Sequence, residues 1–309
     1  MPHTIYYQEI IDDLITEGRL KSYEVTFNTQ NDIELLGAYL WNSHVCSALY
    51  PLLSATEVAL RNAIDSALTS SEGLGYFWWR KNKLHFKSFN PDEPNKKPPF
   101  EVEAIRTNFS KAASQVKQDK KKRYNINNPT PKHQEIIAKT EFSTWEFILS
   151  KEFMGPGLIW PTHLGTVFKG EWNTTKTKEL LSNTKDLVKT VREFRNRVSH
   201  HEPVWKKYGV ATEDDAIEHL HEKIDKILQL LALVSPEKKR LLEKNKIVER
   251  AYRACTLGEL RRFQHNIATH NVKSISKLCR LVQSAQEANS VEKIQVYKMG
   301  KMSFLIHPN

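Results

Sequence analysis

The chain has 309 residues, of which 39% are hydrophobic and 10% aromatic; this composition excludes global disorder and allows one large or two ordinary domains. Three widely spaced cysteines exclude a disulfide framework and favour a reducing, cytoplasmic location. The lack of a long apolar run or a signal peptide argues against membrane association. Of the net charge of +10, +9 falls in residues 235–309, which favours a polyanion such as nucleic acid as partner; a solubilising surface is the alternative.

Helical periodicity predicts a mostly α-helical protein. We expect helices over residues 3–19, 31–70, 101–123, 132–152, 176–201 and 212–234. Pro51 is expected to start a second helix within the long second range, because proline is tolerated in a first helical turn. Residues 77–100 contain four prolines and are expected to form a loop or an excursion from the core, with one of the adjacent Trp78 and Trp79 exposed or in that loop.

Ser235 and Pro236 mark the predicted boundary between a helical domain of residues 1–234 and a basic C-terminal extension of residues 236–309. The extension is expected to hold helices over 237–253 and 272–284 and to end in a β-hairpin over 294–306. Between the two helices, Thr256 with Glu259 three residues later fits a capping box at the start of a further helix. Three helices and a hairpin are compatible with a winged-helix-like segment that binds RNA, and a simple helical extension is the alternative.

One segment, residues 186–205, carries the strongest chemical pattern. Its apolar residues form one helical stripe, and Arg195, Asn196 and His200 fall on another side. Cleavage of RNA without a metal needs a base for the 2′-hydroxyl, an acid for the leaving 5′-oxygen and a cation for the phosphate. His200 can act as acid or base near the end of the helix, Arg195 can supply the fixed charge, and Asn196 can hold the imidazole or a phosphate oxygen.

The string R-N-x-x-x-H formed by these residues resembles the motif of the HEPN ribonucleases, and three blocks resemble their Abi-like (abortive infection) branch. The blocks are residues 52–68, 141–150 and 194–205. The resemblance implies an all-α HEPN-type bundle and a ribonuclease that acts in phage defence or as a toxin, with no cofactor. It also implies a homodimer in which two motif helices face each other and bring two His200 side chains to one phosphate.

Further candidates are open to two interpretations each. Glu57 and Arg61 either form an ordinary helix pair or orient the catalytic group, and His201 either has a chemical role or contacts the chain or the dimer partner. The run Lys120, Lys121, Lys122 and Arg123, beside Tyr124, either grips an RNA backbone or is a solvated loop. The spacing of His219, His221 and Glu222 places the two histidines on different helix faces, so we expect no metal site.

The sequence therefore predicts a metal-independent endoribonuclease that leaves 2′,3′-cyclic phosphate and 5′-hydroxyl ends, with the basic extension holding substrate or regulatory RNA. The alternatives are an RNA-binding or sensing module in which Arg195 and His200 only bind phosphate, and a DNA-binding regulator that acts through residues 236–309.

Overall fold

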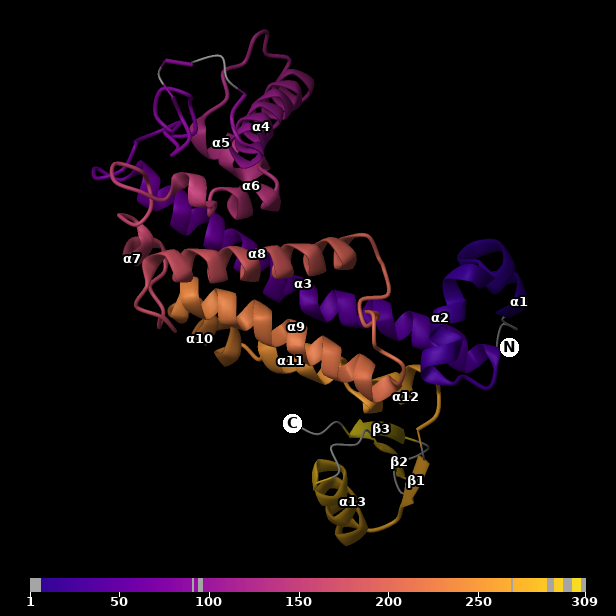
Figure 1. Ribbon diagram of the computed structural model, residues 1–309. Helices are drawn as coiled ribbons and strands as arrows, with labels where there is room; N and C mark the ends of the chain where they lie inside the picture. Colours follow the sequence, from indigo (N-terminus) through magenta and orange to yellow (C-terminus); the bar gives the residue numbers. More distant parts are fainter. Residues whose placement is uncertain are drawn as a thin grey trace. The chain divides into compact units, whose positions relative to one another are not determined.

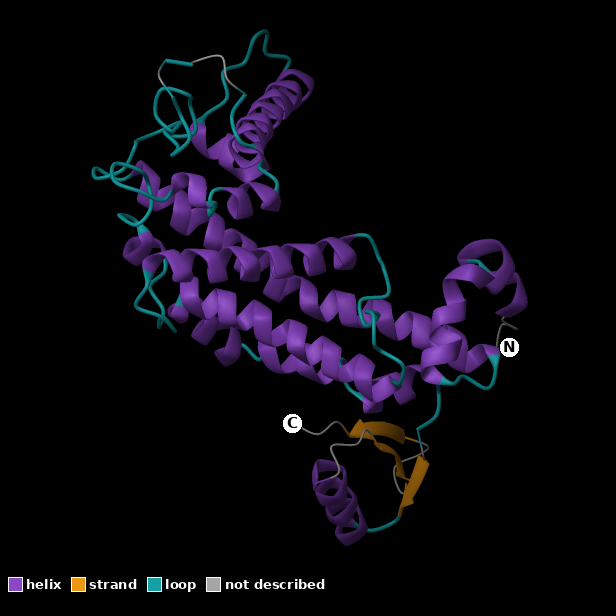
Figure 2. Cartoon of the chain, viewed as in Figure 1, coloured by secondary structure: helices purple, strands orange, loops and turns teal. Residues whose placement is uncertain are grey.

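The computed structural model describes residues 7–90, 92–93, 97–267, 269–287, 292–296 and 302–306, and about two thirds of the chain is helical (Figure 2). The mostly α-helical fold predicted from the sequence is confirmed. The chain forms two compact units. The first contains Met1–Pro51, Arg197–Ile224 and Asn245–Asn309, and the second contains Leu52–Asn196 and Asp225–Lys244. This division differs from the boundary that we placed at residues 234–236.

The N-terminal third is dominated by one long helix (Figure 1). The described elements are α1 (Tyr7–Glu9), a π-helical turn η1 (Ile10–Ile15), α2 (Glu17–Phe27) and α3 (Asp32–Thr69). The prediction that Pro51 starts a second helix is wrong, because α3 continues through it. Proline lacks the N–H that would bond to the carbonyl of Ser47, so the helix accommodates the loss of one hydrogen bond without ending.

The middle of the chain contains short helices between longer ones. These are α4 (Phe100–Tyr124), α5 (His133–Lys139), α6 (Phe142–Phe147), a 3₁₀ turn η2 (Lys151–Phe153) and α7 (Leu164–Val167). The single helix expected over 132–152 is therefore divided, and the break falls where Thr140 and Glu141 adopt extended backbone. Residues 77–90, 92–93 and 97–99 form turns and loop, as predicted. Trp78 and Trp79 are both buried, because a turn, unlike a helix, lets adjacent side chains face the same core.

The second half begins with two amphipathic helices. The described elements are α8 (Thr177–Ser199), α9 (Glu213–Val234), α10 (Pro236–Lys244), α11 (Ile247–Ala254) and α12 (Leu257–Phe263). The helix expected over 237–253 is interrupted at Lys246, whose backbone is left-handed with φ 58°. The predicted cap is present, since the Thr256 hydroxyl accepts a hydrogen bond from the amide of Glu259 at 3.2 Å.

The chain ends in a small mixed sheet with one helix. Strand β1 (Thr269–Val272) pairs in parallel with β2 (Glu292–Val296), α13 (Ile275–Glu287) connects them, and β3 (Met302–Ile306) pairs antiparallel with β2. The predicted hairpin is confirmed by the register from Glu292 opposite Ile306 to Val296 opposite Met302. Helices α10 to α13 account for the helices that we expected in this extension, and β1 is an addition that the sequence did not predict. Its parallel pairing with β2 gives the last part of the chain a β-α-β-β order.

The core of the first unit is aromatic. Trp205 meets Phe27 and Tyr23 with ring centroids 4.8 and 5.1 Å apart, and Phe27 meets Trp41 edge-on at 5.5 Å. The Trp41 indole donates a hydrogen bond of 2.9 Å to the carbonyl of Ala254, so its buried N–H is satisfied. These contacts tie α2, α3, α11 and the loop after α8 into one unit.

The core of the second unit is organised around a buried polar network. Asp65, which is 5% exposed, accepts from the Trp78 indole at 2.9 Å and lies 2.8 Å from Nε2 of His133. The Nδ1 atom of His133 accepts from the amide of Phe77 at 2.9 Å, so Nε2 carries the ring proton. Trp79 stacks on Phe109 of α4 with ring centroids 4.1 Å apart. These contacts hold the loop residues 77–79 against α3, α4 and α5.

Candidate active site at the end of α8

Helix α8 carries the predicted motif, and its burial pattern explains why the motif faces outward. Val188, Val191, Phe194 and Val198 are nearly inaccessible, with 0–4% exposure, and they recur at the three- and four-residue spacing of one helix face. Arg195 and Asn196 are half-buried, and Ser199 and His200 are exposed. The division between the two units falls between Asn196 and Arg197, so Arg195 and Asn196 belong to the second unit and His200 to the first.

In the second unit, Arg195 is held by Glu57. The Nε atom of Arg195 lies 3.2 Å from Oε2 of Glu57, whose side chain is 16% exposed, and Nη1 donates to the Asn196 amide oxygen at 3.4 Å. Glu57 comes from α3, far away in the sequence. Arg195 thus contacts both its motif neighbour Asn196 and the Glu57 carboxylate.

Glu57 and Arg61 of α3 were the two candidates for a residue that orients the catalytic group, with an ordinary helix pair between them as the alternative. The structure places the Glu57 carboxylate against Arg195, whereas Arg61 donates to the neighbouring Asn62 side chain at 3.4 Å. The ordinary helix pair between Glu57 and Arg61 is therefore not the arrangement seen. Because Glu57 is the less exposed partner, it restricts where the Arg195 guanidinium can lie.

Two further ion pairs hold α8 within the second unit. Arg192 donates to the buried Glu146 of α6 at 2.6 Å, and Lys185 pairs with Glu101 of α4 at 3.1 Å. Burial acts to raise the pKa of Glu101, but hydrogen bonds from its own backbone amide, from Lys185 and from Ser150 outweigh burial and hold that pKa below its ordinary value. Ion pairs with α3, α4 and α6 thus hold the polar face of α8 at Lys185, Arg192 and Arg195.

In the first unit, His200 is the capping residue of α8. His201 has a left-handed backbone with φ 54°, its amide bonds to the carbonyl of Val198 at 3.3 Å, and the amide of Glu202 bonds to the carbonyl of Arg197 at 3.0 Å. This pair of bonds is a Schellman motif, which ends a helix and satisfies its last carbonyls. His200 and His201 therefore have different places: the first is an exposed cap residue, and the second supplies the left-handed turn.

The loop after His200 is fixed by side chains that the sequence did not single out. Asn42 of α3, only 3% exposed, donates to the carbonyl of Glu202 at 3.1 Å and accepts from the amide of Val204 at 3.0 Å. Arg197 bonds to the carbonyls of Pro203 and Lys206 at 2.5 and 2.6 Å. The Arg19 guanidinium donates to the carbonyl of His201. His200 thus lies between the last turn of α8 and a loop that these hydrogen bonds hold in place.

A family profile described as Abi-like protein matches residues 16–206. The chain belongs to the Abi-like family. The match contains Glu57, Arg195, Asn196 and His200, and it confirms the Abi-like part of the resemblance found in the sequence. Membership associates the protein with abortive infection, a defence against phage. No curated protein and no solved structure matches the chain.

Of the basic side chains at the end of α4, one is occupied by contacts within the protein and three are exposed. Lys120 pairs with Glu135 at 2.7 Å and bonds to the carbonyl of Thr130 at 3.2 Å, so it connects α4 to α5 and the preceding loop. The next three residues, Lys121, Lys122 and Arg123, are exposed. The exposed positive charge of this run therefore begins at residue 121.

The two histidines of α9 in the Abi-like chain have separate environments. His221 lies with Nε2 2.8 Å from the carbonyl of Cys255, while His219 is 3% exposed and neither ring nitrogen has a hydrogen-bond partner. Burial, and secondarily Lys223 and Lys207, lower the pKa of His219 to about 4. In the part of the chain that the structure describes, no cluster of three His, Cys, Asp or Glu side chains could hold a metal ion.

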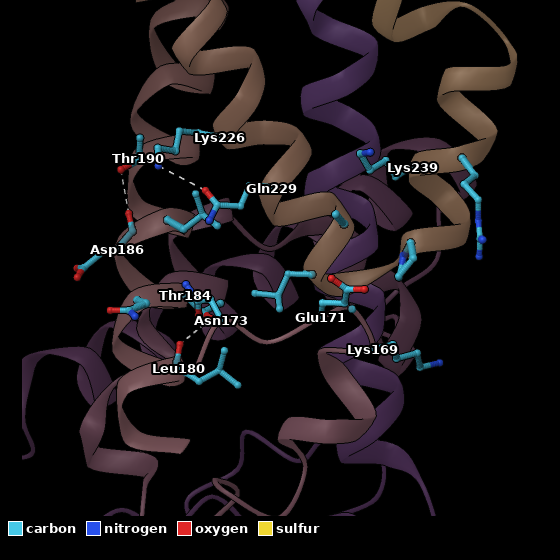
Figure 3. Close-up of a pocket in the computed structure, with 17 residues that line it drawn as sticks. Lys169, Glu171, Asn173, Leu180, Thr184, Asp186, Thr190, Lys226, Gln229 and Lys239 are labelled. Carbon is cyan, nitrogen blue, oxygen red and sulfur yellow. Dashed lines mark hydrogen bonds between the residues drawn. The ribbon is translucent and has the colours of Figure 1, made fainter. Parts of the chain in front are cut away.

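A cavity of about 850 Å³ lies in the second unit between α8, α9, α10 and residues 169–173 (Figure 3). Gly170 allows the close approach of this segment to α9: its amide donates to the carbonyl of Leu233, and a Cβ atom here would lie 2.2 Å from the carbonyl oxygen of Ala232. The hydroxyls of Thr184 and Thr190 bond back to carbonyls of α8.

The motif residues do not line this cavity. Arg195, Asn196 and His200 belong to the outward-facing, C-terminal end of α8, whereas the cavity takes its α8 residues from positions 180–190. The proposed chemistry at the motif therefore does not depend on this cavity. The chain also contains, among its described residues, no helix of the length and apolarity that crossing a membrane requires.

Proposed function

We propose that this Abi-like protein is a metal-independent endoribonuclease whose active residues are Arg195, Asn196 and His200. The observation that carries the proposal is the exposed His200 at the capped end of α8, five residues after an arginine that Glu57 holds in place. An imidazole and a guanidinium at an exposed helix end suit a polymer substrate, because a long phosphodiester chain cannot enter a closed cavity.

The proposed reaction needs only groups that titrate or carry a fixed charge. The 2′-oxygen of a ribose attacks the adjacent phosphorus atom, a base takes its proton, and an acid protonates the 5′-oxygen that leaves. The products are a 2′,3′-cyclic phosphate and a 5′-hydroxyl. Arg195 stabilises the additional negative charge at phosphorus, and Asn196 donates to a phosphate oxygen or holds the imidazole.

A homodimer would divide the two proton transfers between two His200 side chains. One imidazole would act as base and the other, protonated, as acid, so neither would need to change its state within a single turnover. A two-fold axis near the ends of two α8 helices would achieve this. Glu57 has the role of a positioning residue for Arg195 in each copy.

Cleavage of mixed cellular RNA in the presence of EDTA tests the proposal. Wild type, His200→Ala and His85→Ala are compared, and the last variant removes an exposed histidine outside the motif. We expect wild type and His85→Ala to cleave and His200→Ala to be inactive. Equal cleavage by His200→Ala would contradict the assignment, and cleavage that stops in EDTA would contradict a metal-independent reaction.

A second candidate is an RNA-binding or sensing module without cleavage. It is favoured by the charge of +9 in residues 235–309 and by the exposed run Lys121, Lys122 and Arg123. In that case RNA binds with strong salt dependence, none of the three proteins cleaves it, and His200→Ala still protects cells against phage.

A further inference from the structure

A hollow of about 500 Å³ in the second unit lies beside the middle of α4, and none of the described residues that line it is acidic. Its walls come from residues 77–81, from α4, from residues 130–131 and from α5 (Figure 1). The charged residues that line it are Arg80, Lys81, Arg106 and Lys117. Arg106 is half-buried and the other three are exposed, so the hollow is open to solvent and positively charged.

These four cations have no acidic partner among the described residues. The carboxylates of α4, and that of α5, are paired with other lysines. At distances of 2.7–3.4 Å, the pairs are Glu101 with Lys185, Glu103 with Lys97, Asp119 with Lys139 and Glu135 with Lys120. These carboxylates therefore do not neutralise the hollow, and its charge favours an anionic ligand.

Arg106 in particular lacks the polar contacts that a half-buried cation requires. Its guanidinium carbon lies 5.5 Å from the centre of the Phe86 ring, and its buried Nε atom has no hydrogen-bond partner among the described residues. Burial lowers the pKa of Arg106 below its ordinary value, because it removes water from the charged group. An anion bound to the other guanidinium nitrogens would offset this loss of hydration.

The spacing of the cations favours a chain of negative charges over one small anion. Arg106 and Lys117 lie three turns apart on α4, about 17 Å along the helix, so they are not gathered around one point. The same side of the helix continues to Tyr124, because residues 106, 117 and 124 fall within about 20° of one another at about 100° per residue. Tyr124 is 66% exposed. A basic strip of about 27 Å thus ends in an exposed aromatic ring.

Planar groups accompany the cations at the other end of the strip. The Arg80 guanidinium carbon lies 4.7 Å from the centre of the half-buried Phe77 ring. Phe77 has a left-handed backbone with φ 58°, which is unfavourable for a bulky residue, and its amide is held by His133 at 2.9 Å. Unpaired bases stack on aromatic rings and guanidinium planes, whereas the bases of a duplex stack on one another and an acidic peptide has no bases.

We propose that this strip along α4 binds single-stranded RNA, with phosphates at Arg80, Arg106 and Lys117 and unpaired bases stacked at Phe77 and Tyr124. The proposal rests on the proposed function in taking RNA as the ligand, and it adds that the RNA held here is single-stranded. Successive phosphates of one strand would contact successive cations, and the open hollow lets the strand enter and leave. None of these residues belongs to the proposed catalytic set, so binding can be measured apart from cleavage.

Fluorescence anisotropy with a short labelled RNA that cannot pair with itself tests the proposal. Every full-length protein in this assay carries His200→Ala, so that the RNA stays intact. Adding Arg80→Ala/Lys117→Ala should weaken binding about tenfold or more and reduce the slope of log Kd against log salt by about 1.4, because each phosphate contact to a single strand contributes about 0.7. Adding Lys176→Ala/Lys178→Ala removes the same charge from exposed positions of the same unit outside the hollow and should change neither value.

The stacking part of the proposal has its own comparison. Tyr124→Ala should weaken binding about fivefold or more, whereas Tyr208→Ala, at a fully exposed tyrosine of the first unit, should not. A duplex that contains the same RNA strand should bind about fivefold or more weakly than the single strand, because its bases cannot stack on the protein.

Three outcomes would overturn the proposal: equal binding with and without Arg80→Ala/Lys117→Ala, equal binding of the duplex and the single strand, or displacement of the RNA by polyglutamate at equal charge. The last would indicate an acidic protein as the partner. Circular dichroism checks that the double variant is folded, and Lys117→Ala alone replaces it if it is not.

Cleavage by proteins that retain His200 separates this proposal from the proposed function. Arg80→Ala/Lys117→Ala should raise KM and leave kcat unchanged, because the strip binds RNA and takes no part in the reaction. Binding as predicted without any cleavage by wild type would contradict the nuclease proposal alone. Cleavage by wild type with equal RNA binding by the double variant would contradict the strip alone.

Discussion

Replacing Asn42 with alanine should loosen the loop that follows His200. The side chain satisfies one buried donor, the amide of Val204, and one acceptor, the carbonyl of Glu202, at 3.0 and 3.1 Å. A buried backbone donor left without a partner costs about 1–3 kcal/mol, whereas the carbonyl of the exposed Glu202 can bond to water, so we expect Asn42→Ala to lower the free energy of unfolding by about 2 kcal/mol. RNA cleavage should fall as well, because the loop begins at the proposed catalytic residue.

Chemical denaturation of wild type, Asn42→Ala and Ser43→Ala measures this effect. Ser43 is the next residue of α3 and is exposed, so its substitution should change stability by less than about 0.5 kcal/mol. Cleavage is measured well below the unfolding transition, where all three proteins are folded. A loss for Asn42→Ala no larger than for Ser43→Ala would refute the account of this loop.

Three further substitutions separate structural from functional roles. Glu57→Gln should change the free energy of unfolding by less than about 1 kcal/mol, since its ion pair with Arg195 is partly exposed. It should nevertheless reduce cleavage roughly tenfold or more, because Arg195 is no longer held in position. Unchanged cleavage would contradict the positioning role of Glu57. His201→Gly should keep cleavage and raise the melting temperature slightly, because glycine adopts φ 54° without strain; inactivity would instead indicate a chemical role. Burial lowers the pKa of His219 from 6.5 to about 4, so between these values the unfolded chain binds more protons than the folded one. The free energy of unfolding should therefore fall as the pH is lowered from about 6.5 to about 4, by up to about 1.4 kcal/mol per pH unit. Denaturation of His219→Leu across pH 4–7 should lack this contribution, and an unchanged slope would argue against it.

The sequence predicted those features that depend on residues close together in the chain. The periodic stripe of α8, the cap at Thr256 and the C-terminal hairpin follow from local spacing, and the structure has all three. The end of α8 shortly before Pro203 also follows from local sequence, because proline cannot continue a helix. Local rules succeeded where neighbours within a few residues determine the backbone.

Other features depend on partners far apart in the sequence. No local signal shows that Asn42 bonds to residues 202 and 204, or that Glu57 selects Arg195 over Arg61, which stands one helical turn away. The continuity of α3 through Pro51 and the burial of both Trp78 and Trp79 also depend on tertiary packing, which outweighs local preference. Asn42 in the middle of an apolar helix was the available signal, because a buried amide requires partners.

The chemistry of the RNA ends tests the central claim most directly. A defined RNA is incubated with wild-type protein in EDTA, alongside a copy that carries a single 2′-deoxyribose at the cleaved position. The account predicts 2′,3′-cyclic phosphate and 5′-hydroxyl ends from the first RNA, no cleavage at the substituted position of the second, and no products with His200→Ala. Cleavage at the 2′-deoxy position, or 3′-hydroxyl and 5′-phosphate ends, would contradict attack by the 2′-hydroxyl and with it the proposed role of His200.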